Sequence, residues 1–231
     1  MRIALIGYGA MGRLIESLAA VKGHQVVTTV NRAHDGLDAS HLAEALSAAE
    51  VAIDFTSAKA VRRNVEACVL AGVPIVQGTT GWDDERAEIA RIVTDGDGAM
   101  VFGANFSIGM NLFFKIAEYS AKLFAKIPEY EVFLEEQHHS RKKDAPSGTA
   151  LKIKDLLQRH VEVPSVAVTR AGHIPGTHRV GFDSAADQVL LEHTARSREG
   201  FAIGAIMAAE WIIGRKGVFE FTDVIDEVIK G

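Results

Sequence analysis

The sequence is poor in cysteine: Cys68 is the only one in 231 residues. A single cysteine excludes an internal disulfide and favours a reducing compartment, so we expect a cytoplasmic protein. Cys68 lies in the helical pattern "VRRNVEACVLAG", where a small buried hydrophobe is the expected role rather than a nucleophile.

Long apolar runs are also missing. The most apolar stretch, "FAIGAIMAAEWIIG", is interrupted by Glu210 and is too short to span a bilayer. The N-terminal "MRIALIGYGAMG" carries only a short apolar run, which ends in a patterned glycine turn without a cleavage-like site. The sequence therefore predicts a first strand instead of a signal peptide, and no membrane partner.

Positive charge is scarce, with 25 Lys and Arg against 30 Asp and Glu and a net charge of −5. The longest basic stripe is residues 141–143, so we expect no nucleic-acid partner. What remains is an ordinary globular composition, 48% hydrophobic and 24% charged, in a chain long enough for one large or two small domains.

The first hundred residues alternate between two patterns. Short runs rich in β-branched residues predict buried strands at 2–6, 25–30, 51–55, 73–77 and 99–104. Helical patterns separate them at 10–22, 38–49, 57–71 and 83–94. Asp38 and Ser57 are candidate N-caps, and Gly72 is a candidate helix end. This alternation predicts an α/β fold with a doubly wound parallel sheet covered on both faces.

The pattern changes after residue 106. We expect a long amphipathic helix at 107–126, a strand at 129–139, a helix at 149–160 and strands at 165–170 and 187–196, followed by two closing helices. The predicted domains are therefore residues 1–106 and an α+β domain at 107–208, with helices at about 209–231 packing back on the first.

A glycine motif follows the first predicted strand. Gly7, Gly9 and Gly12 form G-x-G-x-x-G at the start of a helix. Gly7 permits the tight turn, Gly9 lets the backbone approach a pyrophosphate, and Gly12 permits close packing of helix and strand. The helix N-terminus then attracts the anion, so this turn is a candidate dinucleotide site. The alternative is a glycine-rich turn that binds nothing.

Two further loops, "GTTG" at 78–81 and "ANFS" at 104–107, each follow a strand and precede a helix. Ligands of open α/β sheets bind at the carboxyl ends of strands, so both loops are candidates for a nicotinamide pocket, or else simple capped turns. The second strand usually ends in an acid that binds the adenosine ribose, but here it is followed by Asn31 and Arg32.

The stretch "HHSRKKDAPSGTA" at 138–150 concentrates titratable and cationic groups. Its PSGT predicts a helix entry whose N–H groups, with Lys142, suit a carboxylate or phosphate. A histidine beside a lysine can donate a proton near neutral pH. The alternative is a capped helix after a solvated basic turn. This stretch contains no cysteine, and its histidines do not have the spacing of metal ligands on a helix or in a zinc finger, so we expect no metal.

The pattern H-H-x-x-K-x-D-x-P-S-G-T-A is similar to the signature of the 4-hydroxy-tetrahydrodipicolinate reductase family, also called dihydrodipicolinate reductase. The glycine turn, "GTTG", "ANFS", "EHT" and "FAIGAI" fall in the family's order, so the resemblance covers nearly the whole chain. It implies a Rossmann domain, a substrate-binding and oligomerisation domain, and a homo-oligomer, commonly a tetramer. It also implies reduction of a small cyclic dicarboxylate by NADPH or NADH in the diaminopimelate and lysine pathway.

The resemblance also implies roles for individual residues. His138 corresponds to the acid/base residue and Lys142 to a second proton donor. The implied substrate clamp is His139, Lys142, Ser147, Gly148 and Thr149. The implied cofactor contacts are Gly7, Tyr8, Gly9, Ala10, Met11, Gly12, Asn31, Arg32, Gly78, Thr79, Thr80, Ala104, Asn105, Phe106 and Ser107.

Two features depart from the family. Asn31 replaces the usual acid, and Asp35 is an alternative ribose ligand. Residues 166–191 look shortened, as though part of a hairpin were lost, which bears on subunit contacts. Two other functions remain open: a two-domain amino-acid dehydrogenase, such as one acting on aspartate, and a non-catalytic redox sensor. The first leaves PSGT unexplained, and the second needs neither His138 nor Lys142.

Overall fold

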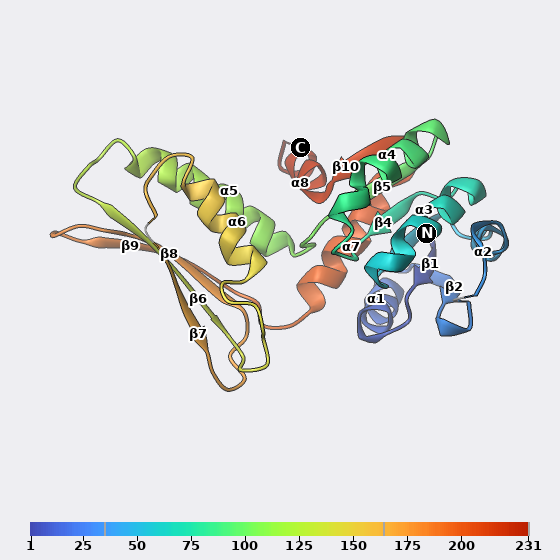
Figure 1. Ribbon diagram of the computed structural model, residues 1–231, viewed down its shortest axis with the longest axis horizontal. Helices are drawn as coiled ribbons and strands as arrows, with labels where there is room; N and C mark the ends of the chain where they lie inside the picture. Colours follow the sequence, from blue (N-terminus) through green and yellow to red (C-terminus); the bar gives the residue numbers. More distant parts are fainter. Residues whose placement is uncertain (35, 164, 231) are drawn as a thin grey trace. The chain divides into compact units, whose positions relative to one another are not determined.

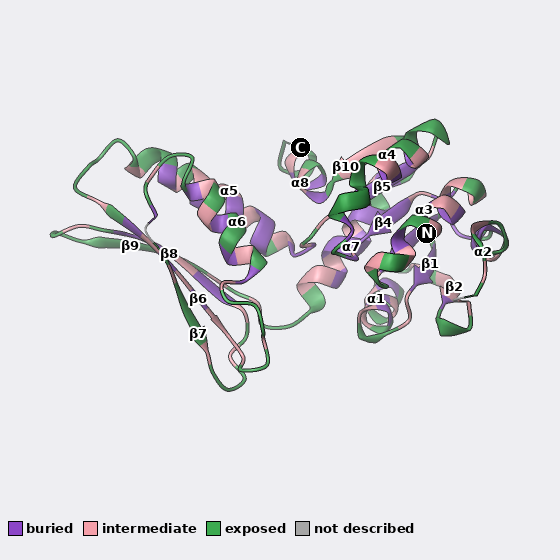
Figure 2. Cartoon of the chain, viewed as in Figure 1, coloured by how far each residue is buried: buried purple, intermediate pink, exposed green. Residues whose placement is uncertain are grey.

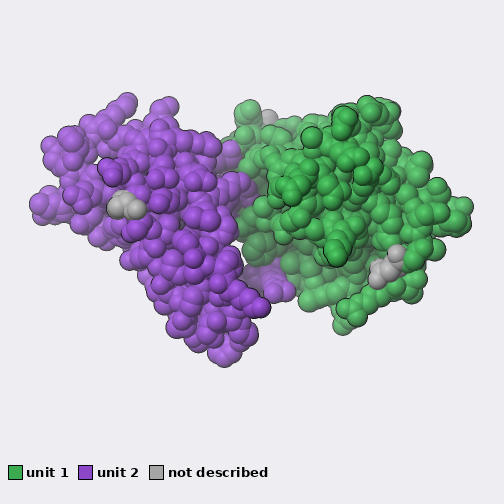
Figure 3. Space-filling view, in the orientation of Figure 1, with its two compact units in different colours: residues 1–108, 199–231 green, residues 109–198 purple. Residues whose placement is uncertain are grey.

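The computed structural model describes residues 1–34, 36–163 and 165–230. The chain divides into two compact units, Met1–Ile108 with Glu199–Gly231, and Gly109–Arg198 (Figure 3). No helix in the described part of the chain is both long enough and apolar enough to cross a membrane.

The first unit contains a six-stranded parallel sheet in the order β10-β5-β4-β3-β1-β2 (Figure 1). Its strands are β1 (Arg2–Ile6), β2 (Gln25–Val30), β3 (Val51–Asp54), β4 (Ile75–Gln77), β5 (Ala99–Phe102) and β10 (Gly217–Glu220). Buried residues run along the central strands (Figure 2), as the continuous apolar runs predicted. The four-residue β10 was missed, because so short a run is recognisable as a strand only through its pairing with β5.

Helices cover this sheet. They are α1 (Ala10–Val21), α2 (Ala39–Leu46), α3 (Ala58–Ala71), α4 (Arg86–Asp95), α7 (Glu199–Ile212) and α8 (Phe221–Lys230), with 3₁₀ turns η1 (Arg32–His34) and η2 (Asp83–Glu85). α1 packs against α7, and α3 packs against both α2 and α4. The Asp38 carboxylate caps α2 by accepting from the His41 N–H, and Gly72 ends α3 at φ +67°. Ser57 precedes α3, but its side chain makes no capping bond.

Helix α7 lies wholly in the first unit, whereas the sequence placed residues 199–208 in the second domain. The reason is close packing by small residues. Ala202, Ala205 and Ala208 are fully buried, and α7 contacts β3, β4 and β5. A Cβ at Gly204 would lie 1.8 Å from the Phe106 carbonyl oxygen, so this helix approaches the loop after β5 at backbone distance.

The strand order reverses between β1 and its two neighbours, since the chain goes from β1 to β2 on one side and to β3 on the other. Such a switch point opens a crevice outside the carboxyl ends of the strands. The loops that follow β1 and β3 therefore border the same crevice.

The second unit has a four-stranded mixed sheet in the order β7-β6-β8-β9, covered by α5 (Ile108–Phe124) and α6 (Gly148–Leu157). Its strands are β6 (Glu131–His138), β7 (Val166–Arg170), β8 (Thr177–Asp183) and β9 (Gln188–Thr194). Alternate residues of β6, Val132 and Leu134, pack with Val180 and Phe182 of β8 in one core beneath the helices.

Strand β8 was missed, and the shortening of residues 166–191 relative to the family stays a prediction. β8 pairs along its whole length with β9 and from Thr177 to Asp183 with β6, so the hairpin is complete. The sequence "THRVGFD" did not read as a strand because its buried face carries a histidine, His178, in line with Val180 and Phe182.

Candidate functional site

The glycine turn has the geometry for which its motif requires glycine. Gly7 has φ +93°, and a Cβ there would lie 2.4 Å from the Phe55 carbonyl oxygen. A Cβ on Gly12 would lie 2.4 Å from the Gly7 carbonyl oxygen, so the turn folds directly onto the helix. Gly9 precedes α1 without a side-chain cap and has open space around its Cα. The first N–H groups of α1 are thus left for a ligand.

A cavity of about 850 Å³ opens at the switch point, in the size range of small-molecule sites. Among the predicted cofactor contacts, Gly7, Tyr8, Gly9, Asn31 and Arg32 line it. The other lining residues are Ile6, Arg13, Val30, Phe55, Thr56, Ser57, Ala60 and Arg63. Three arginines in a chain of net negative charge make this cavity suitable for phosphates. The uncapped helix and the glycine backbone fit the same group, a dinucleotide.

Two of these arginines, Arg13 and Arg63, were not predicted. Arg13 lies in the first turn of α1, so its place directly after the glycine motif could have revealed it. Arg63 lies on α3 and donates to the carbonyl oxygens of His34 and Leu37 at 3.4 and 3.3 Å. Only the packing of α3 beside the β2–α2 connection reveals that Arg63 reaches the cavity.

Asn31 is exposed and folds into its own turn. Its Oδ1 accepts from the Ala33 N–H at 3.0 Å, at the start of η1. An amide here brings no negative charge to the ribose end of the cavity, and Arg32 beside it brings a positive one. Asp35, the alternative ribose ligand, lies outside the described residues.

The other predicted cofactor residues are distributed over three segments. Ala10 and Met11 form the first turn of α1. Gly78 contacts the Phe55 ring, Thr79 is buried and Thr80 is exposed. In the loop after β5, Ala104 is exposed, and Asn105 Oδ1 accepts from the Ser107 N–H at 2.9 Å. The Phe106 side chain is a core group packed on Phe221, which leaves only its backbone for a ligand.

In the second unit, β6 ends at His138, and His139 follows at its edge. Lys142 pairs with Asp144 at 2.9 Å, and this hydrogen bond lowers the pKa of the Asp144 carboxyl. Ser147 caps α6, with its Oγ accepting from the Ala150 N–H at 3.1 Å, and Gly148 and Thr149 begin the helix. The predicted helix entry at PSGT is therefore confirmed.

The donors of Ser147 are engaged by a residue that the sequence analysis did not single out, Glu136. Glu136 is buried on β6, and its carboxylate accepts from the Ser147 N–H at 2.9 Å, from Ser147 Oγ, and from Arg170 Nη2 at 2.5 Å. Both donors of Ser147 are thus bonded to Glu136 in the structure, and the place of Ser147 in the substrate clamp stays a prediction. Gly148 and Thr149 remain as the predicted clamp residues of the first turn.

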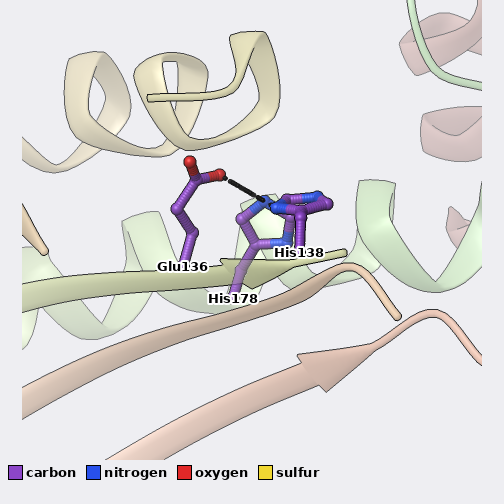
Figure 4. A group of neighbouring side chains, drawn as sticks. All are labelled: Glu136, His138 and His178. Atoms are coloured by element: carbon purple, nitrogen blue, oxygen red, sulfur yellow. Dashed lines mark ion pairs between the residues drawn. The ribbon is translucent and has the colours of Figure 1, made fainter. Parts of the chain in front are cut away.

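Glu136 also lies among imidazoles. Its Oε2 is 3.5 Å from His138 Nδ1 and 3.6 Å from Nε2 of His178, which faces it across the β6–β8 ladder (Figure 4). The spacing of Glu136 and His138, two apart on one strand, could have revealed the first contact. Arg170 and His178 depend on strand pairing and could not be found from local sequence.

The charges of this cluster follow from burial. Desolvation raises the pKa of the Glu136 carboxyl, but the donors Ser147 and Arg170 outweigh it and hold the pKa below its usual value. Burial lowers the pKa of His138; the Glu136 carboxylate opposes this shift, and Lys142 and Arg170 add to it. Burial lowers the pKa of His178 to about 4. At neutral pH the cluster therefore consists of a carboxylate and a guanidinium beside neutral imidazoles.

Glu136, His138 and His178 bring three potential metal ligands within 4.8 Å of one another. Two features favour proton chemistry instead. Arg170 already neutralises the carboxylate at 2.5 Å, and Ser147 occupies both of its oxygens. A metal ion here would have to displace a cation and two hydrogen bonds.

Comparison with known proteins is consistent with both units. The family model for the N-terminus of dihydrodipicolinate reductase matches residues 1–106, and the model for its C-terminus matches residues 109–225. The chain belongs to the dihydrodipicolinate reductase family. A 4-hydroxy-tetrahydrodipicolinate reductase of Christiangramia forsetii is 35% identical over 244 residues, with 100% of both chains covered. One of Archaeoglobus fulgidus is 35% identical over 265 residues, covering 98% of this chain and 100% of the relative.

Solved structures agree on the fold. A dipicolinate-bound dihydrodipicolinate reductase from Paenisporosarcina sp. TG-14 superposes with a TM-score of 0.79 at 20% identity, covering 95% of this chain and 97% of that one. A probable dehydrogenase from Thermotoga maritima reaches a TM-score of only 0.57 at 9% identity, covering 99% and 94%. The Rossmann-type unit and the mixed-sheet unit predicted from the sequence are therefore confirmed.

Proposed function

We propose that this protein reduces 4-hydroxy-tetrahydrodipicolinate to tetrahydrodipicolinate with a reduced nicotinamide dinucleotide, in the diaminopimelate and lysine pathway. The observation that carries this proposal is the folded stretch 138–149. It combines the His138 imidazole, the Lys142 cation and a helix N-terminus in one unit, in a chain whose other unit has a dinucleotide-type cavity. An activity that uses both features is a hydride transfer to an anionic substrate.

In this proposal the first unit holds the cofactor. The glycine turn and the start of α1 bind the pyrophosphate, while Gly78–Thr80 and Ala104–Ser107 border the nicotinamide. When bound, the reduced nicotinamide supplies a hydride to a conjugated imine. The chain itself has to place the cofactor and supply the compensating proton.

We further propose that NADPH is used at least as well as NADH. A carboxylate at position 31 would repel the 2′-phosphate of NADPH, whereas the Asn31 amide does not. Arg13, Arg32 and Arg63 line the same cavity, and a guanidinium fork matches the geometry of a phosphate.

The substrate is a small cyclic dicarboxylate in this proposal. Dipicolinate, bound to the Paenisporosarcina relative, belongs to the same chemical class. His139, Lys142, Gly148 and Thr149 clamp the carboxylates, through a cation and the free end of a helix.

His138 is the acid/base residue and Lys142 the second proton donor. Burial lowers the pKa of His138 in the ligand-free protein, so the imidazole is neutral at pH 7. A bound dianion stabilises the protonated imidazole and raises that pKa again, which makes the proton available when substrate is present. Ser147 belongs to this site through Glu136, because its donors hold that carboxylate.

The two other functions account for less of the molecule. An amino-acid dehydrogenase would use the first unit and leave Lys142 and the start of α6 without a role. A redox sensor needs neither His138 nor Lys142, although both belong to one polar cluster with Glu136 and Asp144.

A homo-oligomer is also proposed, with the tetramer expected from the resemblance. The face of the second sheet away from α5 and α6 carries Phe133, half-buried over Gly181, and exposed Leu190. An open sheet face with apolar side chains and two free edge strands favours association. Light scattering at micromolar concentration tests this, and a monomer would contradict it. The cytoplasm remains the expected compartment.

The activity is tested directly by coupling. The unstable substrate is generated in situ by the preceding synthase, this protein is added, and the loss of reduced-nicotinamide absorbance is followed. Oxidation of cofactor that requires both synthase and protein supports the proposal. Activity only with aspartate and oxidised cofactor would favour the amino-acid dehydrogenase, and cofactor binding without turnover would favour the sensor.

A further inference from the structure

Asp54 is a fully buried carboxylate at the carboxyl end of β3, below the cofactor cavity. Its hydrogen-bond partners in the described part of the chain are all neutral groups. Burial raises the pKa of the carboxyl, and hydrogen bonds from Thr56, Asn64 and Gln77 oppose that rise. A buried acid without a cationic partner is costly, so a role beyond packing is needed to explain it.

The carboxylate sets the direction of two buried amides. Asn64 Nδ2 and Gln77 Nε2 donate to the same oxygen, Asp54 Oδ2, at 2.8 and 3.0 Å. Because both NH₂ groups point at Asp54, both amide oxygens point away from it. The Asn64 Oδ1 then accepts from Arg63 Nη2 at 3.1 Å, and the Gln77 Oε1 accepts from the Thr79 N–H at 3.0 Å.

The other carboxylate oxygen of Asp54, Oδ1, connects the loops that contain Thr56 and Thr79. Thr56 Oγ1 donates to Asp54 Oδ1 at 2.7 Å, and Thr79 Oγ1 does so at 3.4 Å. Thr79 Oγ1 in turn accepts from the Thr56 N–H at 2.8 Å. The loop after β3, which lines the cavity, is thereby tied to the "GTTG" loop after β4.

We propose that Asp54 is a positioning residue for the dinucleotide cavity. Through its two oxygens it orders the Thr56 loop, the Thr79 loop and Arg63 together, without touching the ligand itself. This inference rests on the proposed function, because it assumes that the cavity binds a dinucleotide.

Only a carboxylate can make this arrangement. Four donor groups converge on the two oxygens of Asp54. An asparagine at position 54 would offer one oxygen to two of these donors and turn its NH₂ group toward the other two. If the asparagine oxygen faces Asn64 and Gln77, its NH₂ faces the Thr56 and Thr79 hydroxyls, which would have to accept instead of donate. If the asparagine is reversed, Gln77 or Asn64 would have to flip, which breaks the bond of Gln77 to Thr79 or of Asn64 to Arg63. Either flip disturbs the cavity wall.

The test is Asp54→Asn, measured by cofactor titration and by steady-state kinetics in the coupled assay. We expect the Kd and KM for NADPH to rise about tenfold or more, with kcat at saturating cofactor within about threefold of wild type. The control is Val93→Ala, a fully buried apolar residue of α4, which lowers stability without changing the Kd. The Tm of each variant is measured by thermal melting, so that Asp54→Asn is compared with a control of similar stability.

A paired substitution separates positioning from loss of stability. In Asp54→Asn with Asn64→Asp, the new carboxylate at position 64 can accept both from the new amide and from Arg63. We expect it to recover part of the NADPH affinity. If Asp54→Asn does not fold, Asn64→Leu is decisive, because it removes the side-chain link between Asp54 and Arg63 at a position outside the cavity lining.

The outcomes distinguish failure of the positioning role of Asp54 from failure of the proposed reductase function. Folded Asp54→Asn or Asn64→Leu with wild-type Kd and KM overturns the positioning role and leaves the reductase intact. A fall in kcat with unchanged KM also overturns it. Wild-type protein that binds neither NADPH nor NADH overturns the proposed function, and this inference with it.

Discussion

The burial of His178 leads us to predict that the free energy of unfolding falls as the pH is lowered. Burial, together with His138 beside it, lowers the pKa of the His178 imidazole to about 4, from an ordinary value of 6.5, while the Glu136 carboxylate opposes this shift. Between these two pH values the unfolded chain binds a proton that the folded one does not. Stability from this group is therefore complete above about pH 6.5 and is lost as the pH falls toward 4.

The magnitude follows from the shift. One pKa unit corresponds to about 1.4 kcal/mol, so a shift of roughly 2.5 units amounts to about 3 kcal/mol between pH 7 and pH 4. That is a large part of the 5–15 kcal/mol typical of a folded protein. Glu136 adds a loss of the same sign at lower pH, because its depressed pKa makes the carboxylate favour the folded state.

The assay compares wild type with His178→Gln in urea unfolding followed by circular dichroism, at several pH values from 7 to 4.5. Glutamine cannot take up a proton, so we expect the pH slope of the variant to be smaller by up to about 3 kcal/mol over this range. Because groups distant from position 178 titrate equally in both proteins, the difference isolates His178 together with its coupled neighbours Glu136 and His138. Parallel pH profiles for the two proteins would refute the reasoning.

Three further predictions concern the cofactor and the chemistry. His138→Gln and Lys142→Ala should each lower kcat by about 10²- to 10⁴-fold in the coupled assay while NADPH titration is unchanged, and turnover within about threefold of wild type would contradict their roles. Asn31→Asp should shift the NADPH/NADH ratio of kcat/KM about 10- to 100-fold toward NADH, since a charge-assisted hydrogen bond contributes roughly 1.5–3 kcal/mol; an unchanged ratio would show that position 31 does not contact the ribose. Gly7→Ala should lower the Tm and weaken NADPH binding, because its Cβ would overlap the Phe55 carbonyl, whereas Gly23→Ala, also at positive φ but with open space, should cost only about 1–2 kcal/mol of strain and keep the affinity. Equal binding by these two variants would argue against a close approach at Gly7.

Local sequence was sufficient for five of the six strands of the first unit's sheet and for the two motifs. The strands β1 to β5 are continuous apolar runs, and the glycine turn and PSGT have their conformations set by adjacent residues. Such features depend on backbone geometry and side-chain size over a few positions, which the order of residues determines directly. Asp38 as a cap and Gly72 as a helix end belong to the same group.

Tertiary structure alone decided which charged groups meet. Glu136 acquires its environment from Arg170 on β7 and His178 on β8, strands that pair with β6 only after the sheet has formed. Arg63 reaches the cofactor cavity because α3 packs beside the β2–α2 connection, and Asp54 collects donors from three separate segments. These contacts join residues from 10 to 42 positions apart, and the pKa values depend on burial in the folded chain. The sequence shows which charged and polar side chains are present, but burial and strand pairing determine which of them interact.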